Sequence, residues 1–364
     1  MSSPGSDSFP TPRRILVVQT AFLGDIILAL PLVQVARRTW PDARVDFLTI
    51  PVAAGLLAGH PDIGERIIYD KRGRDRGFAA FHRLARRLRA TRYDLAVVPH
   101  RSIRSAALVT AARIPRRVGF DRSAGRRLFH HVVPYRWDVH EIHRNLELLR
   151  PFGVDPERRE RPFLPLTADD RGVVDGWLSE RGIAGDREVI ALAPGSVWAT
   201  KRWLPEGFAD LAERLQAEGF AVVLVGGPED VPLAEAIAER CATAPPIAAG
   251  PFSLRQSTAL IDRARLLVTN DSAPLHLAVA RRTPIVAIFG ATVPALGFYP
   301  YGRDDMVVER TELACRPCGR HGGNRCPLGH FHCMRRIGAD DVFDAVRERL
   351  RRAENASEQM ETDP

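Results

Sequence analysis

A turn of three polar residues, Asn270-Asp271-Ser272, separates an apolar run at 265–269 from a helix-compatible stretch at 273–281. This order predicts a strand, a turn and a helix. The first amides of such a helix and the positive end of its dipole point to one place at the carboxyl end of the strand, which favours an anion, most often a phosphate. The alternative is that Asp271 or Ser272 only caps the helix.

Two more turns follow apolar runs in the same half of the chain. Residues 194–196 (Pro-Gly-Ser) lead to Lys201, and residues 226–230 (GGPED) include Glu229. A lysine beside glycine and serine amides suits a diphosphate, and a carboxylate suits ribose hydroxyl groups. Neither GxGxxG nor GxxxxGK[ST] occurs at these turns, which argues against an NAD site or a P-loop. The turns therefore predict a nucleotide diphosphate of the kind found in a nucleotide-sugar.

A scaffold of alternating strands and helices would position these turns. Apolar, β-branched runs alternate with helix-like segments along both halves of the chain, as in parallel sheets covered on both faces. At 364 residues the length suits about two domains. The sequence therefore predicts two α/β domains in tandem with a cleft between them. Asp25 lies at the start of the helix that follows the first strand, either as an ordinary cap or as a carboxylate presented to a ligand, and Pro31 should kink that helix.

The predicted boundaries follow from these patterns. We expect a disordered lead at 1–13, an N-terminal domain at 14–165 that includes a short edge strand at 117–120, and a C-terminal domain at 166–338. An amphipathic helix at 339–352 and a disordered tail at 353–364 follow, because the tail has no core-forming pattern.

The net charge of +8 comes from one segment. Residues 71–150 hold 20 Lys or Arg against 6 Asp or Glu, whereas the rest of the chain is slightly acidic, with 32 against 38. A localised basic field suits phosphorylated partners, nucleic acid or an anionic membrane, or it is only a solvated surface. The first residues do not resemble a signal peptide, and no apolar run reaches the length of a membrane span. We therefore expect a cytoplasmic protein.

Four of the five cysteines lie within nineteen residues, in the pattern C-x2-C-x7-C-x6-C. This spacing suits a structural zinc site, with free thiols and disulfides as alternatives. A cytoplasmic compartment disfavours stable disulfides. The candidate ligands are Cys315, Cys318, Cys326 and Cys333.

Four segments together carry a family resemblance: RILVVQTAFLGDIILALPLV, APGSVWATKRWLPEGFADL, VVLVGGPED and VTNDSAPLHLAVA. In this order and spacing they resemble the lipopolysaccharide heptosyltransferases of glycosyltransferase family 9, particularly the heptosyltransferase II type, over roughly residues 14–352. The resemblance implies a GT-B fold of two Rossmann-like domains facing each other across a cleft. It implies transfer of heptose from ADP-L-glycero-β-D-manno-heptose, bound by the C-terminal domain, to the inner core of lipopolysaccharide.

The resemblance also assigns roles to residues. Asp25 matches the proposed general base, and Lys201 matches the lysine that contacts the donor diphosphate and assists its departure. Because protein groups meet the phosphate charge, we expect an inverting displacement that needs no metal cofactor. The remaining expected donor contacts are Ser196, Glu229, Asp271, the amides of Ser272 and Ala273, and His276. Ala273 stands where the family often has glycine, and His276 is alternatively a packed core histidine.

The acceptor is expected to be a lipid A-Kdo-type lipopolysaccharide at the inner face of the cytoplasmic membrane, to which the enzyme would be peripheral. Basic residues of the charged segment should meet its phosphates and acidic sugars. The expected acceptor contacts are Arg83, Arg86, Arg87 and Arg122.

Two alternatives compete with this function. One is a family member that uses another nucleotide-sugar. The other is a basic nucleic-acid-binding protein with a four-cysteine zinc module, which is disfavoured because the basic segment has few aromatic residues for base stacking. We therefore expect no nucleic-acid partner.

Overall fold

The computed structural model describes residues 10–157, 159–183, 185 and 187–362 and divides into two units, Met1–Phe163 and Leu164–Pro364. Residues 1–9 of the predicted disordered lead lie outside the described residues, as do 363–364 of the predicted tail. The two units are described separately below.

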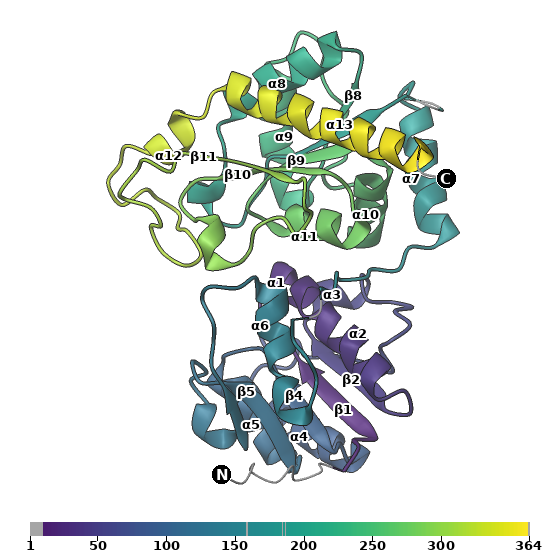
Figure 1. Cartoon of the computed structure of the whole chain (residues 1–364), viewed down its shortest axis with the longest axis vertical. Coiled ribbons are helices and arrows are strands. Elements are labelled where there is room, and N and C mark those ends of the chain that lie inside the picture. Colours follow the sequence, from purple (N-terminus) through teal and green to yellow (C-terminus); the bar gives the residue numbers. More distant parts are fainter. Residues whose placement is uncertain (1–9, 158, 184, 186, 363–364) are drawn as a thin grey trace. The chain divides into compact units, whose positions relative to one another are not determined.

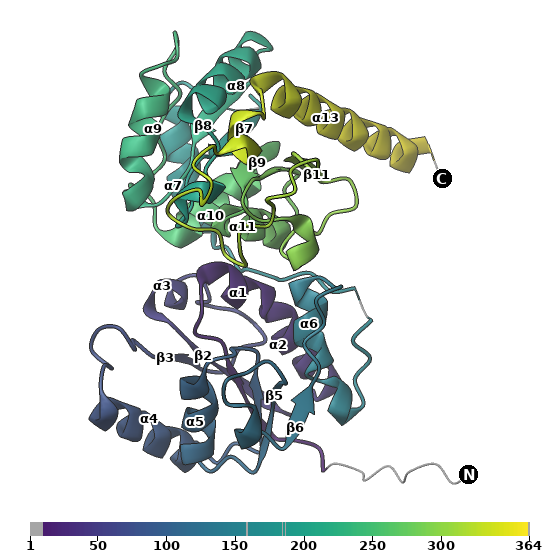
Figure 2. The ribbon, with the colours of Figure 1, turned by 90° about the vertical axis from the view of Figure 1, so that its left-hand side faces the viewer.

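Within the described residues, the first unit holds a six-stranded parallel sheet of order β3-β2-β1-β4-β5-β6. Its strands are β1 (Arg14–Val18), β2 (Arg44–Thr49), β3 (Arg66–Ile68), β4 (Leu95–Val98), β5 (Arg116–Phe120) and β6 (His131–Val133). The central strands are buried on both faces, because helices cover both. α1, α2 and α6 pack together on one face, and α4 and α5 lie side by side on the other (Figures 1 and 2).

The helices of the first unit are α1 (Leu23–Leu28), α2 (Leu30–Thr39), α3 (Pro51–Ala54), α4 (Phe78–Thr91), α5 (Ile103–Ala111) and α6 (Glu141–Glu147), with the 3-10 turns η1 (Arg126–Leu128) and η2 (Arg150–Phe152). The single helix predicted after β1 is broken at Ala29, with Pro31 at the start of α2. The Leu32 amide donates a hydrogen bond to Ala29 O at 3.2 Å, and the side-chain amide of Asn145 donates to Leu28 O at 3.0 Å. Asn145 thus fastens α6 to the break between α1 and α2.

The second unit holds, among its described residues, a five-stranded parallel sheet of order β11-β10-β9-β7-β8. Its strands are β7 (Val189–Ala193), β8 (Ala221–Leu224), β9 (Leu266–Asn270), β10 (Ile285–Phe289) and β11 (Met306–Glu309). α13 packs along α8 over one face of the sheet, and α10 packs against α7 and α11 over the other (Figure 1). The helices are α7 (Ala168–Ser179), α8 (Pro205–Ala217), α9 (Val231–Ala238), α10 (Leu254–Arg263), α11 (Ala273–Arg281), α12 (His332–Arg335) and α13 (Ala339–Thr362), with η3 (Ala199–Lys201), η4 (Pro228–Asp230) and η5 (Pro294–Leu296).

Each sheet has one point at which the direction of winding reverses. It lies between β1 and β4 in the first unit and between β7 and β9 in the second. In open α/β sheets, ligands bind outside the carboxyl ends of the strands at such a switch point, because the connections leave it in opposite directions. The segments that follow these four strands are therefore the first places to look for a site.

Two sequence expectations differ from the observed elements. The segment predicted as an edge strand, 117–120, lies within β5, between β4 and β6, and β6 forms the edge. β6 was not predicted. The last helix extends to Thr362 instead of ending at 352, so the predicted disordered tail was wrong for 353–362. Residues 353–362 contain no Pro or Gly and include two Ala and three Glu, so helix propensity is sufficient to extend α13.

In the part of the chain that the structure describes, no helix combines the length and apolar character needed to cross a bilayer.

Candidate functional site

The turns that follow β7 and β9 meet at the switch point of the second sheet. Lys201, at the end of η3, donates from Nζ to Asp271 Oδ2 at 2.6 Å. Thr292, three residues beyond β10, donates from Oγ1 to the same oxygen at 2.6 Å. Both charged side chains are largely buried. Asp271 therefore orients the lysine, and the remaining N–H bonds of the ammonium group can reach an anion.

The side chain of Asn270, the last residue of β9, binds the backbone at both ends of the segment that follows β7. Its side-chain oxygen accepts from Trp203 N at 3.0 Å, and its side-chain nitrogen donates to Pro194 O at 2.7 Å. The indole of Trp203 is buried and donates to Ile337 O at 2.9 Å. The backbone on both sides of Lys201 is thereby anchored in the core, which limits the movement of the lysine.

The N-terminus of α11 follows Asp271 directly. Ser272 is the N-cap residue in extended conformation, and within the described part of the chain no side chain caps this helix. Pro274 has no N–H and Leu275 N donates to Ser272 O at 3.2 Å. The amides that can meet an anion at this helix start are therefore those of Ser272 and Ala273. The interpretation that Asp271 or Ser272 serves only as a helix cap does not fit this geometry.

His276 lies one turn into α11 and is only 4% exposed. Burial lowers its pKa to about 4, and Lys201 contributes in the same direction against an opposing effect of Asp271. Its Nδ1 has no hydrogen-bond partner among the described residues, and its ring meets Phe298 edge-on at 6.3 Å. The imidazole is therefore neutral at pH 7 and lies within electrostatic range of the Lys201–Asp271 pair.

The turn after β8 approaches the turn after β7 closely. Asp230 Oδ2 accepts from Gly227 N at 3.0 Å, and a Cβ on Gly195 would lie 2.2 Å from Asp230 Oδ1. A side chain at 195 would therefore require the Asp230 side chain to move. Burial and the neighbouring Glu229 raise the pKa of Asp230. Glu229 itself is exposed, so it can accept hydrogen bonds from a ligand while Asp230 shapes the turn.

In the first unit, Asp25 occupies the third position of α1, so Phe22 rather than Asp25 is the N-cap residue. Its Oδ2 accepts from Phe22 N at 3.2 Å. Burial and repulsion from Glu141 raise the pKa of Asp25 to about 7, against opposing effects of the Phe22 amide and Arg101. The helix-capping contact is therefore real, but the carboxyl group also has the proton affinity of a general base that works near neutral pH.

Glu141, the first residue of α6, belongs to a buried network. Its Oε2 accepts from Arg144 at 2.6 Å and from Tyr135 Oη at 3.1 Å. Arg144 is completely buried and also donates to the backbone oxygens of Trp137 and Val139. The Glu141 carboxylate is thus held in place beside Asp25.

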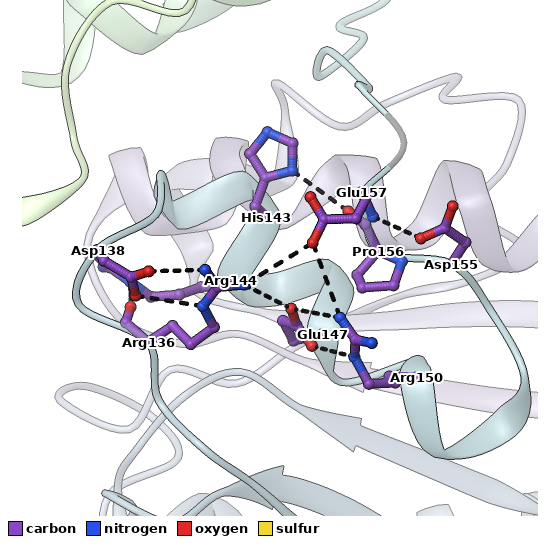
Figure 3. Close-up of polar contacts among 9 residues, drawn as sticks. All are labelled: Arg136, Asp138, His143, Arg144, Glu147, Arg150, Asp155, Pro156 and Glu157. Carbon is purple, nitrogen blue, oxygen red and sulfur yellow. Dashed lines mark hydrogen bonds and ion pairs between the residues drawn. The ribbon is translucent and has the colours of Figure 1, made fainter.

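A second set of ion pairs fixes the outer side of α6. Figure 3 shows Glu147, which accepts from Arg150 at 2.6 Å and pairs with Arg136 at 3.5 Å. Arg136 in turn pairs with Asp138, and both arginines lie near Glu157. These pairs tie α6 to the segments before and after it.

Basic side chains gather near the carboxyl ends of β1, β3 and β4. Lys71 donates from Nζ to Thr20 O at 2.6 Å, and His100 Nδ1 lies 3.0 Å from Thr20 Oγ1 and 2.8 Å from Ser105 Oγ. Burial, with Lys71 and Arg101, lowers the pKa of His100 to about 4, and burial, with neighbouring arginines, lowers that of Lys71. Arg104 stacks over the Tyr69 ring at 5.2 Å. The neutral histidine leaves the positive charge to the lysine and arginines.

The four arginines predicted to contact the acceptor do not lie together. Arg122 follows β5 at the carboxyl edge of the sheet. Arg87 pairs with Glu65, which precedes β3, so Arg87 lies at the amino edge, far from the end of β1 that leads to Asp25. Arg83 and Arg86 are exposed on α4 between these edges. Their role stays a prediction, but Arg87 is poorly placed for a shared site with Asp25.

The cysteine-rich segment, residues 315–333, contacts the turn η3 that carries Lys201. Thr200 N donates to Gly323 O at 2.9 Å, and Gly323 N donates to Thr200 Oγ1 at 2.8 Å. Burial raises the pKa of Cys318, and that of Cys333 to about 11, with neighbouring thiols contributing. The thiols are free, and among the described residues no three His, Cys, Asp or Glu side chains have the spacing of metal ligands. The structural zinc site therefore stays a prediction, and the positions of the cysteine side chains do not favour it.

Sequence reasoning missed several residues of these clusters. Thr292 follows β10 at the carboxyl edge of the sheet, so the rule that ligands bind at strand ends could have found it. From the turn at 226–230, the exposed Glu229 was selected from the sequence, and its neighbour Asp230 was not. No sequence signal places Glu141 beside Asp25, because that contact depends on how α6 packs on α1.

Comparison with known proteins gives consistent results. The family model "Glycosyltransferase family 9 (heptosyltransferase)" matches residues 81–327. The chain is 31% identical to lipopolysaccharide heptosyltransferase 3 of Escherichia coli over 74% of this chain and 82% of that protein. Among solved structures it resembles a family 9 glycosyl transferase from Veillonella parvula, with a TM-score of 0.84, 24% identity and coverage of 93% and 97% of the two chains.

A second solved structure supports the fold. The E. coli ADP-heptose lipopolysaccharide heptosyltransferase II superposes with a TM-score of 0.77 at 24% identity, covering 94% of this chain and 99% of that one. The prediction of a GT-B fold built from two parallel-sheet α/β domains is confirmed.

The Asp25–Glu141 proximity generates a prediction about pH. Catalysis by Asp25 requires its ionised form, so kcat/KM should rise with pH through about 7. Glu141→Gln keeps hydrogen-bonding atoms for Arg144 and Tyr135 but removes the repulsion, so the pKa of Asp25 should fall and the ascending limb should move to lower pH. A pH profile of kcat/KM measures this shift and does not depend on the folded fraction.

The matched control is Glu147→Gln, which neutralises another buried glutamate of α6 that pairs with Arg150. It should leave the limb where it is. An identical limb in the wild-type and Glu141→Gln enzymes would show that Glu141 does not set the proton affinity of the base.

Proposed function

The chain belongs to glycosyltransferase family 9 and is a heptosyltransferase of the lipopolysaccharide core, and we propose that it transfers heptose from ADP-L-glycero-β-D-manno-heptose with inversion at the anomeric carbon. The observation that carries the donor assignment is the Lys201–Asp271 pair beside the uncapped N-terminus of α11. A lysine and helix amides at a switch point suit a diphosphate. The neighbour named as an ADP-heptose heptosyltransferase supports the choice of nucleotide.

In this proposal the second unit binds the donor. Lys201 and the amides of Ser272 and Ala273 meet the diphosphate, and Ser196 contributes from the turn after β7. Asp271 carries negative charge and already binds Lys201, so it positions the lysine rather than contacting phosphate. Glu229 holds the ribose, and neutral His276 lies beside the phosphate-binding groups.

The first unit binds the acceptor. The basic groups at the carboxyl edge of its sheet, among them Lys71, Arg101, Arg104 and Arg122, meet the acidic groups of a lipid A-Kdo-type acceptor. Asp25 follows β1 and Arg101 follows β4, so the base and a cation flank the switch point of this sheet. A cytoplasmic enzyme peripheral to the inner membrane face, with no nucleic-acid partner, fits this assignment.

The reaction is a single displacement. Asp25 takes the proton of the acceptor hydroxyl group as its oxygen bonds to the anomeric carbon, and the bond from that carbon to the diphosphate breaks on the opposite side. The charge that develops on the departing ADP is stabilised by Lys201 and the amides of Ser272 and Ala273. Since protein groups supply this stabilisation, we expect transfer to proceed without a metal cofactor.

Transfer from ADP-heptose to a series of truncated lipopolysaccharides, with ADP release as the readout, tests the proposal. We expect saturable transfer to an inner-core acceptor that persists in EDTA. A parallel series of other nucleotide-sugars distinguishes the nearest alternative. Faster turnover with another sugar would contradict the assigned donor, and loss of activity in EDTA would contradict the metal-free mechanism.

Asp25→Asn should lower kcat by on the order of 10²-fold or more, because the amide cannot accept the acceptor proton. The affinity for ADP, measured by calorimetry, should hardly change, since the donor residues belong to the other unit. Near-normal turnover of this variant would restrict Asp25 to its bond with the Phe22 amide.

Lys201→Ala should weaken ADP binding about tenfold or more, the usual effect of losing a charge-assisted contact of ~1.5 to 3 kcal/mol, and should slow transfer as well. The chain has one other lysine, Lys71, which provides the matched control. Lys71→Ala should leave ADP affinity unchanged and raise the KM for the acceptor. Equal effects of the two variants on ADP affinity would contradict the assignment of donor and acceptor to separate units.

A further inference from the structure

An exposed aromatic side chain stands at the first position of α4. Phe78 is 79% exposed, more than any other large hydrophobic side chain in the described part of the chain. Its ring stacks on Phe81 at 6.5 Å and meets His82 edge-on at 4.5 Å. Phe81 is itself packed against the core of the first unit. The exposed ring therefore has a rigid base.

The chain before Phe78 is densely basic. Residues 71–77 read KRGRDRG, and Arg72, Arg74 and Arg76 are all exposed. Asp70 accepts from the amides of Gly73 and Arg74, and Asp75 accepts from the amide of Asp70 and pairs with Arg74 at 3.6 Å. Arg72 and Arg76 outnumber the acidic groups that remain in the loop. Arg83 and Arg86 continue the positive charge along the exposed face of α4. We call Phe78 with Arg72, Arg74 and Arg76 the Phe78 patch.

Arg104 connects the patch to the sheet. Its Nε donates to Tyr69 Oη, its Nη2 donates to Asp75 O at 3.5 Å, and its guanidinium lies 6.0 Å from the Phe81 ring. The basic loop is thus held against α5 at the carboxyl edge of the sheet, the edge that also carries Asp25.

Other exposed apolar side chains follow neighbouring strands at this edge. Val52 comes three residues after β2 and is 58% exposed, and Ile103 begins α5 after β4 and is 52% exposed. Scattered apolar side chains in a basic field are a poor match for a protein partner, which requires a contiguous, complementary surface. They suit an anionic bilayer, which requires no shape match and attracts arginines through its phosphate groups while it takes up apolar side chains.

We propose that the Phe78 patch docks the enzyme on an anionic lipid bilayer, with the Phe78 ring inserted among the headgroups. This inference rests on the proposed function, because it names the surface through which the enzyme meets a membrane-embedded acceptor. Docking at the carboxyl edge brings the side of the sheet that carries Asp25 toward the lipid, whereas the amino edge with Arg87 would face away from it.

Co-sedimentation of the full chain with vesicles tests the proposal. Vesicles of phosphatidylethanolamine and phosphatidylglycerol should bind the protein, vesicles of phosphatidylcholine should bind it far less, and binding should weaken at high salt. Phe78→Ala should weaken binding about tenfold, as expected when one phenyl ring no longer leaves water. Arg72→Gln, Arg74→Gln and Arg76→Gln together should reduce both the binding and its salt dependence.

The matched control is Leu328→Ala, which removes another exposed apolar side chain, 64% exposed, from the other unit. It should not change vesicle binding. Equal losses for Phe78→Ala and Leu328→Ala, or equal binding to neutral and anionic vesicles, would overturn the proposal. The proposal would also be overturned if the protein bound an RNA oligonucleotide in a Phe78-dependent way and did not bind vesicles.

A deacylated, water-soluble acceptor separates this proposal from the proposed function. Phe78→Ala should lower kcat/KM for acceptor presented in vesicles and leave that for the deacylated acceptor unchanged. Equal losses with both acceptors would assign Phe78 to acceptor binding and reject membrane docking. Absence of transfer from ADP-heptose to any of these acceptors by the wild-type enzyme, with vesicle binding intact, would reject the proposed donor and acceptor and leave membrane docking standing.

Discussion

Parallel strand pairing is the constraint on which both candidate sites depend. Because all strands of a sheet run in one direction, every connecting turn after a strand emerges at the same edge. At the switch point, successive connections leave toward opposite faces, so the turns there are open to a ligand. Asp25 and Arg101 flank this point in the first unit, as Lys201 and Asp271 do in the second. Residues about 70 positions apart in sequence, such as Lys201 and Asp271, meet for this reason alone.

The buried charged group that the proposed mechanism uses has a neighbour of opposite charge in the second unit and a neighbour of like charge in the first. In the second unit a carboxylate and an ammonium group are paired, so that the charge of Lys201 is retained in a largely buried position. In the first unit, burial raises the pKa of Asp25, and the negative charge of Glu141 raises it further. A cation that must stay charged benefits from a partner of opposite sign, whereas a base that must take up a proton benefits from a neighbour of the same sign.

The basic segment of the first unit, residues 71–150, contributes arginines to both edges of the sheet. α4 follows β3 and runs back along the sheet, so its first residue, Phe78, lies at the carboxyl edge and Arg87, which pairs with Glu65, lies at the amino edge. The high density of arginine is a property of the segment as a whole. The division between a surface near Asp25 and a surface far from it is a property of helix direction.

Much of the fold was determined by sequence alone. The alternation of apolar runs and helix-like segments predicted two α/β domains with parallel sheets. The turns 194–196, 226–230 and 270–272 do lie at adjacent strand ends, because local patterning defines each element without reference to its neighbours. β6 and β11 were missed although β3, β4 and β8 are equally short, so strand length alone does not explain the miss. The tertiary structure alone decided that Thr292 shares Asp271 with Lys201, that Glu141 lies beside Asp25, and that the cysteine segment bonds to Thr200. Each of these contacts joins elements whose patterns are independent in sequence, and only the packing of the helices and loops on the sheet brings them within the few ångströms over which hydrogen bonds and charges act.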